Sequence, residues 1–205
     1  MKTSTITDID GNVYKTVIIG NQEWMAENLR VTRFSDGTQI PHIVDSNDWM
    51  NTKTGAYCVY DNNDNFKSKY GLLYNWFAVS SLHGIAPEGF KVPSLDDLIE
   101  FYKALGNNPM SGAKLKSSPE LWNNKCETTN DFGFNAIPSG NRQYHDGRFT
   151  NGETYSYGKI ASYWCADEDF GRLGLNIKLD ANTNGIHQNW YEFNNGYSVR
   201  CLKNI

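Results

Sequence analysis

The clearest periodic pattern of hydrophobic positions lies at residues 94–105 and predicts an amphipathic helix. Ser94 stands where a cap residue is expected, Asp97 follows it at the position of a capping box, and Gly106 comes just after the last apolar position. Apolar residues recur three and four positions apart, which places them on one face of the helix: Leu95, Leu98, Ile99, Tyr102 and Leu105. This face is expected to pack against a sheet.

A second, mostly apolar stretch at residues 72–79 also predicts a helix, because turn residues follow it closely. Alternating or nearly alternating apolar positions predict strands at residues 13–19, 55–60 and 197–202. Pairs of Asp or Asn with Gly tolerate the positive φ angles of tight hairpin turns, and they recur at residues 10–11, 36–37, 146–147, 184–185 and 195–196.

The chain reads as one domain over residues 1–205, because no Pro/Ser-rich tract, charge block or fixed-period repeat divides it. Both predicted helices lie in the first half, and the second half has almost no helical pattern. This distribution predicts an α+β fold with antiparallel sheets, two flanking helices and long irregular loops.

Composition narrows the class of protein. Only 20% of the residues are charged, 14% are aromatic, and the formal net charge is -4. A negative chain without a basic stripe does not fit a nucleic-acid-binding protein, and so many aromatic residues do not fit a disordered one. No apolar run approaches the roughly 18 residues of a transmembrane helix.

Sequence motifs of common enzymes are missing. The chain has no G-x-S-x-G and no H-E-x-x-H pattern, and its histidines are scattered. The four cysteines, none of them in a C-x-x-C pair, leave two readings open, namely four buried thiols or one or two disulfides: Cys58, Cys126, Cys165 and Cys201.

Residues 61–65 place Asp and Asn oxygens close together, as a calcium ion requires. The closing Glu of a calcium loop is replaced by Leu72, so a solvated turn is the favoured reading. The sequence therefore assigns no metal and no cofactor, with calcium left as an unsupported alternative.

Several ordered motifs resemble the Fibrobacter succinogenes major paralogous domain family. The sequence at 89–98, GFKVPSLDDL, is similar to the element that opens the second helix of C-type-lectin-like and formylglycine-generating-enzyme-like domains. The other pieces resemble the family in the same order, and together the resemblance covers residues 6–203: the stretches 10–29, 70–76, 138–142, 161–164 and 196–201.

The resemblance implies a C-type-lectin-like fold in which the terminal strands pair and a long irregular region carries the ligand surface. It also implies an extracellular or cell-surface protein whose signal peptide has been removed, although the first residues fit a cytosolic start equally well. Trp76 and Trp164 are expected in the core. Family members often carry a Cys-Pro where this chain has Ala86-Pro87, so the usual partner of Cys201 is missing.

The region from 141 to 195 combines aromatic rings and amides, which suit recognition of a glycan or a protein. We expect a non-enzymatic binding module that uses this region. Its aromatic residues include Tyr155, Tyr157 and Phe170, and its candidate ligand-binding residues are Tyr144, His145, Arg148, Asp167, Asp169, Arg172, His187, Asn189, Trp190 and Tyr191.

Three other functions stay open at this stage. One is a structural or adhesive surface subunit, and another is a variable receptor diversified by a retroelement. The third, an oxidase of the formylglycine-generating type, is disfavoured because that chemistry needs two neighbouring thiols, and Cys165 and Cys201 are far apart in the sequence.

Overall fold

The computed structural model describes residues 3–123, 126–150 and 158–204. Over these ranges it contains three antiparallel sheets, four short α-helices and four short 3-10 helices. The predicted α+β class with mostly antiparallel sheets is therefore confirmed. The described helices include none that is both long and apolar enough to cross a membrane.

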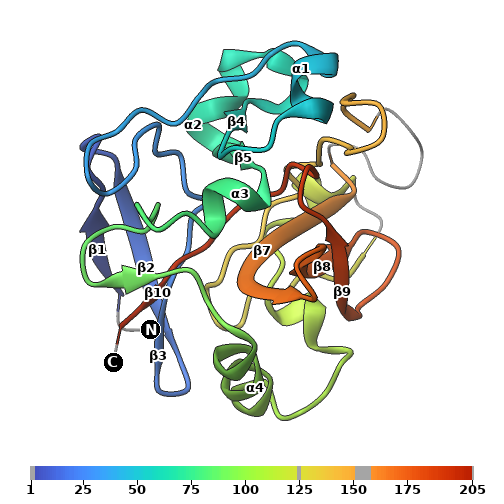
Figure 1. Cartoon of the computed structure of the whole chain (residues 1–205). Helices are drawn as coiled ribbons and strands as arrows, with labels where there is room; N and C mark the ends of the chain where they lie inside the picture. The colour runs from blue at the N-terminus through green and yellow to red at the C-terminus, as the bar shows by residue number, and fades with distance from the viewer. Residues whose placement is uncertain (1–2, 124–125, 151–157, 205) are drawn as a thin grey trace.

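A five-stranded sheet joins the two ends of the chain (Figure 1). Its strands follow the order β1-β2-β3-β10-β6, with these bounds: β1 Thr3–Thr7, β2 Val13–Ile19, β3 Gln22–Met25, β10 Leu202–Lys203 and β6 Phe90–Lys91. The predicted strand at 13–19 is confirmed as β2. Because Leu202 pairs with both Trp24 of β3 and Lys91 of β6, the last strand lies inside the sheet.

A separate three-stranded sheet dominates the second half of the chain. It consists of β7 (Ile160–Asp169), β8 (Leu173–Asp180) and β9 (Ile186–Glu192). The tight turn between β7 and β8 uses positive φ angles at Phe170 and Gly171, and the Phe170 side chain at its tip is 95% exposed. A small third sheet pairs β4 (Tyr57–Cys58) with β5 (Leu73–Tyr74).

The predicted helix at 94–105 is confirmed as α4 (Leu95–Ala104). Its capping box is complete, with the Ser94 side chain accepting from the backbone of Asp97 and the Asp97 carboxylate accepting from the backbone of Ser94. The other α-helices are α1 (Ser46–Asn51), α2 (Lys67–Tyr70) and α3 (Trp76–Val79), and the 3-10 helices are η1 (Tyr60–Asn62), η2 (Asp64–Phe66), η3 (Ser111–Lys114) and η4 (Pro119–Trp122).

The predicted helix at 72–79 is wrong over its first half. Leu73 and Tyr74 form β5, and the Tyr74 backbone also bridges to Tyr197. Asn75 then caps a single helical turn by accepting from the backbone N–H of Ala78. An apolar run this short is buried on all sides, so its pattern alone does not separate strand from helix.

The last predicted strand, at 197–202, is shorter than expected. Tyr197 and Ser198 make only isolated bridges to Tyr74 and Tyr163, and regular pairing begins at Leu202. The alternation predicted for residues 197–202 is nevertheless present, because Arg200 points away from the core that contains Val199 and Cys201.

The β7–β8–β9 sheet separates two hydrophobic cores. Its alternate residues Tyr163, Leu175 and Ile177 join the first core, which includes the buried face of α4. Trp164 and Trp76 join the second core, which extends to the five-stranded sheet, and both are buried as predicted.

Buried cations hold the irregular segments together. The side chain of Arg142 is fully buried and donates to the carbonyls of Gly147, Ile43, Val44 and Asp45 at 2.6–2.9 Å. Its guanidinium also lies over the rings of Trp49 and Phe149, at 4.6 and 5.0 Å from their centroids. One side chain thus fastens the 141–149 loop to the segment that leads into α1.

Arg200 and Lys116 play the same part elsewhere. Arg200 is 1% exposed, donates to the Asn28 side chain and to the carbonyls of Phe134 and Asn135, and lies over the Phe134 ring. Lys116 is fully buried and donates to the carbonyls of Asp180 and Thr183. Both use carbonyl oxygens and ring faces rather than carboxylates.

The four cysteines are free thiols in this structure. The alternative with one or two disulfides is therefore not the one that the structure shows. Cys58, Cys165 and Cys201 are buried, whereas Cys126 is partly exposed. Burial raises the pKa of the Cys58 thiol to about 12 and raises the pKa of Cys165 and Cys201 further. None of these three is suited to act as a thiolate nucleophile near neutral pH.

We predict that replacing Arg142 with Met lowers the free energy of unfolding by about 3 kcal/mol or more. The substitution leaves several buried carbonyls without a donor, and each such loss costs about 1–3 kcal/mol. Urea unfolding measures the change. The matched control, Arg148→Met, removes an exposed arginine from the same loop and should stay within about 0.5 kcal/mol. Equal effects of the two substitutions would contradict the anchoring role of Arg142.

We also predict that a thiol reagent such as 5,5′-dithiobis(2-nitrobenzoic acid) modifies only Cys126 quickly in the folded protein, because the other thiols are buried and protonated. Adding guanidinium should release the remaining three. Cys126→Ser should abolish the fast phase, and a second fast-reacting thiol in that variant would show that the buried cysteines are accessible.

Candidate functional site

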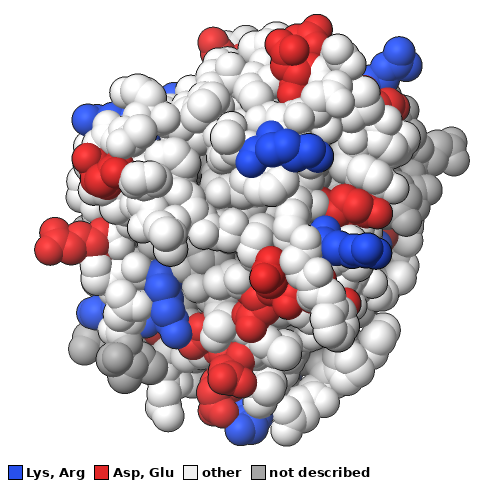
Figure 2. All heavy atoms as spheres, viewed as in Figure 1, with Lys and Arg blue, Asp and Glu red and all other residues white. Residues whose placement is uncertain are grey.

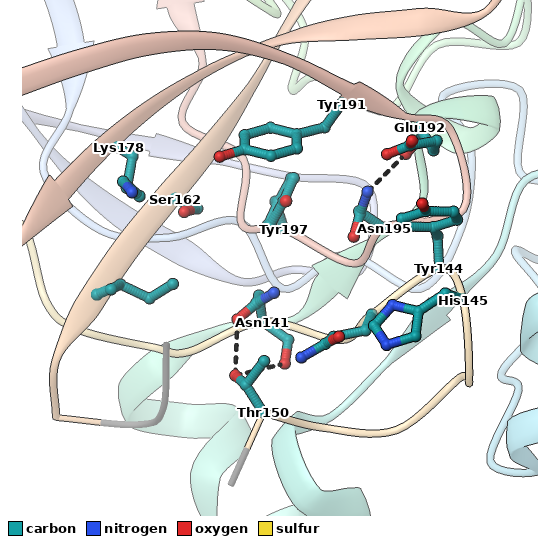
Figure 3. A pocket seen from close by; sticks show the side chains of 12 residues that line it. Asn141, Tyr144, His145, Thr150, Ser162, Lys178, Tyr191, Glu192, Asn195 and Tyr197 are labelled. Carbon is teal, nitrogen blue, oxygen red and sulfur yellow. Dashed lines mark hydrogen bonds between the residues drawn. The ribbon is translucent and has the colours of Figure 1, made fainter. Parts of the chain in front are cut away.

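A cavity of about 260 Å³ between the three-stranded sheet and the 141–150 loop is the candidate site (Figure 3). We call it the Tyr191 pocket. Its wall combines aromatic rings, amides, hydroxyls and two opposite charges, contributed by Asn141, Gln143, Tyr144, His145, Thr150, Ile160, Ser162, Lys178, Tyr191, Glu192, Asn195 and Tyr197.

The sheet supplies one wall because alternate residues of neighbouring strands share a face. Ser162 of β7 lies directly opposite Lys178 of β8, and Tyr191 of β9 lies on the same face farther along the sheet. The Tyr191 ring packs edge-on against the buried Tyr197 ring, with 5.6 Å between their centroids. The pocket is thus the open end of the face that elsewhere covers the second core.

The loop supplies the opposite wall, and Arg142 determines its position. The backbone N–H and carbonyl of Arg142 pair with the carbonyl and N–H of Gly196 at 3.0 and 2.8 Å. The Arg142 side chain points away from the pocket, toward the four backbone carbonyls to which it donates. Its neighbours Asn141 and Gln143 therefore line the pocket. The same pairing brings Asn195 and Tyr197 to the site.

Hydrogen bonds within the wall hold several polar groups in place. The Thr150 hydroxyl donates to Asn141 Oδ1 at 2.7 Å, and Asn195 Nδ2 donates to the Glu192 carbonyl at 3.0 Å. At the rim, the Glu192 carboxylate next to Tyr144 raises the pKa of the Tyr144 phenol. The Tyr144 phenol and the Glu192 carboxylate are thus paired at the rim of the pocket.

A second hollow, of about 450 Å³, adjoins the Tyr191 pocket on the far side of this rim. The two share Tyr144, His145 and Glu192. The remaining residues of the second hollow come from the α1 region, α3, the start of β8 and the segment after β9: Met50, Lys53, Phe77, Arg172, Phe193 and Asn194.

The structure brings together only part of the predicted set. Tyr144, His145 and Tyr191 line the Tyr191 pocket, and Arg172 lies in the second hollow. His187 and Asn189 share the sheet face of Tyr191 but stand outside the lining, and the His187 ring contacts the Thr183 hydroxyl at 3.2 Å.

Other predicted residues lie elsewhere for identifiable reasons. Asp167 Oδ2 accepts from the backbone N–H of Leu95 at 2.6 Å, so it holds the first turn of α4. Trp190 alternates with Tyr191 along β9 and therefore packs against the first core. Asp169 and the exposed Arg148 line neither hollow. Tyr155 and Tyr157 fall outside the described residues.

Several lining residues were not predicted, because each looked like an ordinary strand or loop residue. Ser162 lies in the buried first half of β7, and Lys178 is a half-buried position in the mostly buried β8. A polar residue within such an apolar run is the signal that could have found them. The following had no such signal, because only the fold brings them together: Asn141, Gln143, Thr150, Glu192, Asn195 and Tyr197.

Acidic and basic side chains are scattered over the face shown in Figure 2, with uncharged surface between them. Within the described part of the chain, no three His, Cys, Asp or Glu side chains gather as a metal site would require. Residues 61–65, the calcium alternative, form the end of η1 and the start of η2.

Comparison with known proteins identifies the family. Neither the curated proteins nor the solved structures gave a match to this chain. The family model described as the Fibrobacter succinogenes major domain matches residues 17–203, which is most of the chain and nearly the whole of the predicted range. The chain belongs to the Fibrobacter succinogenes major domain family.

Proposed function

We propose that this protein is a non-enzymatic binding module whose site is the Tyr191 pocket, with a glycan or a protein segment as its ligand. The observation that carries the proposal is the wall of the pocket, in which the Tyr191 and Tyr197 rings stand beside amides and hydroxyls. Aromatic surface with a few placed polar groups is the usual composition of a ligand site.

The size of the pocket favours a small unit. Its volume of about 260 Å³ lies just under the roughly 300–1,000 Å³ of common ligand pockets. One sugar ring or one side chain suits this space. Sugar rings place apolar faces on aromatic residues and direct their hydroxyls to amides, which is the pairing that Asn141, Gln143 and Asn195 could complete.

The state of the thiols supports binding rather than oxidase chemistry. Cys165 belongs to the first core and Cys201 to the second, and burial raises the pKa of both. A thiolate pair for copper would need exposed, neighbouring cysteines of lowered pKa.

We further propose a C-type-lectin-like fold and an extracellular or cell-surface location. The fold proposal draws support from the pairing of β10 with β3, which joins the ends of the chain, and from the long irregular segments that form the pocket. The proposed location rests on the family resemblance.

We predict that Tyr191→Ala lowers binding to glycans by about tenfold or more, as expected when one stacking ring is lost from a small site. A glycan array identifies the ligands, and titration calorimetry then measures the loss. Phe170→Ala is the matched control, because it removes an exposed aromatic ring that lines neither hollow. If the folded Tyr191→Ala protein bound glycans with wild-type affinity, the Tyr191 pocket would not be the binding site.

A further inference from the structure

The two adjoining hollows carry a local charge opposite to that of the whole chain. The formal net charge of the protein is -4. Among the described residues that line the hollows, however, the cations are Lys178, Lys53 and Arg172, and the carboxylate is Glu192. An acidic protein that gathers cations around a concave surface presents a site for a negatively charged ligand.

The Tyr191 pocket has donors for an anion at one end. Figure 3 shows Lys178 and Ser162 side by side at one end of the pocket, with Glu192 and Tyr144 at the other. The cross-strand pairing of Ser162 with Lys178 fixes this neighbourhood. An ammonium beside a hydroxyl offers the charge-assisted and neutral hydrogen bonds that a carboxylate or a sulfate accepts.

The second hollow also has cations that can bind an anion, namely Lys53 and Arg172. Neither Lys53 nor Arg172 forms an ion pair with any residue that the structure describes, and the nearby Glu192 carboxylate is adjacent to the Tyr144 phenol. Both cations are thus available to a ligand. The guanidinium of Arg172 has the planar geometry that binds a carboxylate or sulfate through two parallel hydrogen bonds.

The separation of the cations indicates an extended ligand. Arg172 immediately precedes β8, and Lys178 lies toward the other end of that strand. A strand rises roughly 3.3 Å per residue, so the two Cα atoms lie roughly 20 Å apart. The shared rim of Tyr144, His145 and Glu192 lies between the two hollows, so a chain bound in one reaches the other across it.

We propose that the ligand is an acidic glycan chain. This inference rests on the proposed binding function and specifies its ligand class. One anionic sugar unit occupies the Tyr191 pocket with its charged group at Lys178 and Ser162, and a later unit places its charge at Arg172 and Lys53. The ring stacking at Tyr191 favours sugar over an acidic peptide.

Calorimetric titration of the folded protein tests the proposal with oligogalacturonides, sulfated oligosaccharides and neutral oligosaccharides of matched lengths. Lys178→Gln should lower the affinity for the acidic chains by about tenfold and leave the neutral ones unchanged. Arg172→Gln should weaken only acidic chains long enough to reach the second hollow. The sulfated and carboxylated arms show which anion is preferred.

Lys114→Gln is the matched control, because it removes one exposed positive charge that lines neither hollow. An equal loss in this variant would mean that binding follows net charge, and would overturn the proposal. Equal affinity for an oligoglutamate peptide, or equal affinity for neutral and acidic chains, would also overturn it. Neutral glycans that bind and depend on Tyr191 would overturn the acidic-ligand proposal and preserve the proposed binding function. No binding to any glycan would overturn the acidic-glycan proposal and leave a protein segment as the ligand of the proposed function.

Discussion

The fold depends on buried cations whose partners are backbone carbonyls. Irregular segments cannot satisfy their own carbonyl groups as helices and sheets do, and a buried carbonyl without a donor costs free energy. Arg142 satisfies four such groups, while Arg200 and Lys116 satisfy two each. Aromatic faces complete the surroundings of each charge. A chain with few helices can therefore keep long loops in fixed positions.

The candidate site is a product of this arrangement. Arg142 joins the 141–149 loop to Gly196 through its backbone and to residues 43–45 through its side chain. The neighbours of Arg142 then face the sheet that carries Lys178 and Tyr191. The residues that shape the pocket and the residue that holds it are thus adjacent in sequence but point in opposite directions. Asn141 and Gln143 face the pocket, and the Arg142 side chain faces the interior.

The sequence predicted those parts of the fold that rest on local rules. The helix α4 follows from its capping box and its apolar face, and β2 follows from alternation beside a turn. The run at 72–79 failed because tertiary pairing, rather than propensity, converts its first half to β5. In the site, Tyr191 could be chosen for its chemistry, but Trp190 could not be separated from it until the register of β9 showed which face each occupies. Lys178 and Asn141 meet only through contacts between distant segments, and no local pattern encodes these.

The partners of Arg142 have a consequence for how such proteins can diverge. All four acceptors are main-chain atoms, so the side chains at 43, 44, 45 and 147 are not what Arg142 recognises. Most of these positions can exchange residues while the anchor persists, except Gly147, where an added Cβ would collide with the Ser46 carbonyl. Arg142 holds this loop through backbone atoms rather than through the side chains of the loop. Tyr144, His145 and their neighbours can therefore be replaced without loss of these contacts. The chemistry of the pocket wall can then change while the backbone around it stays the same.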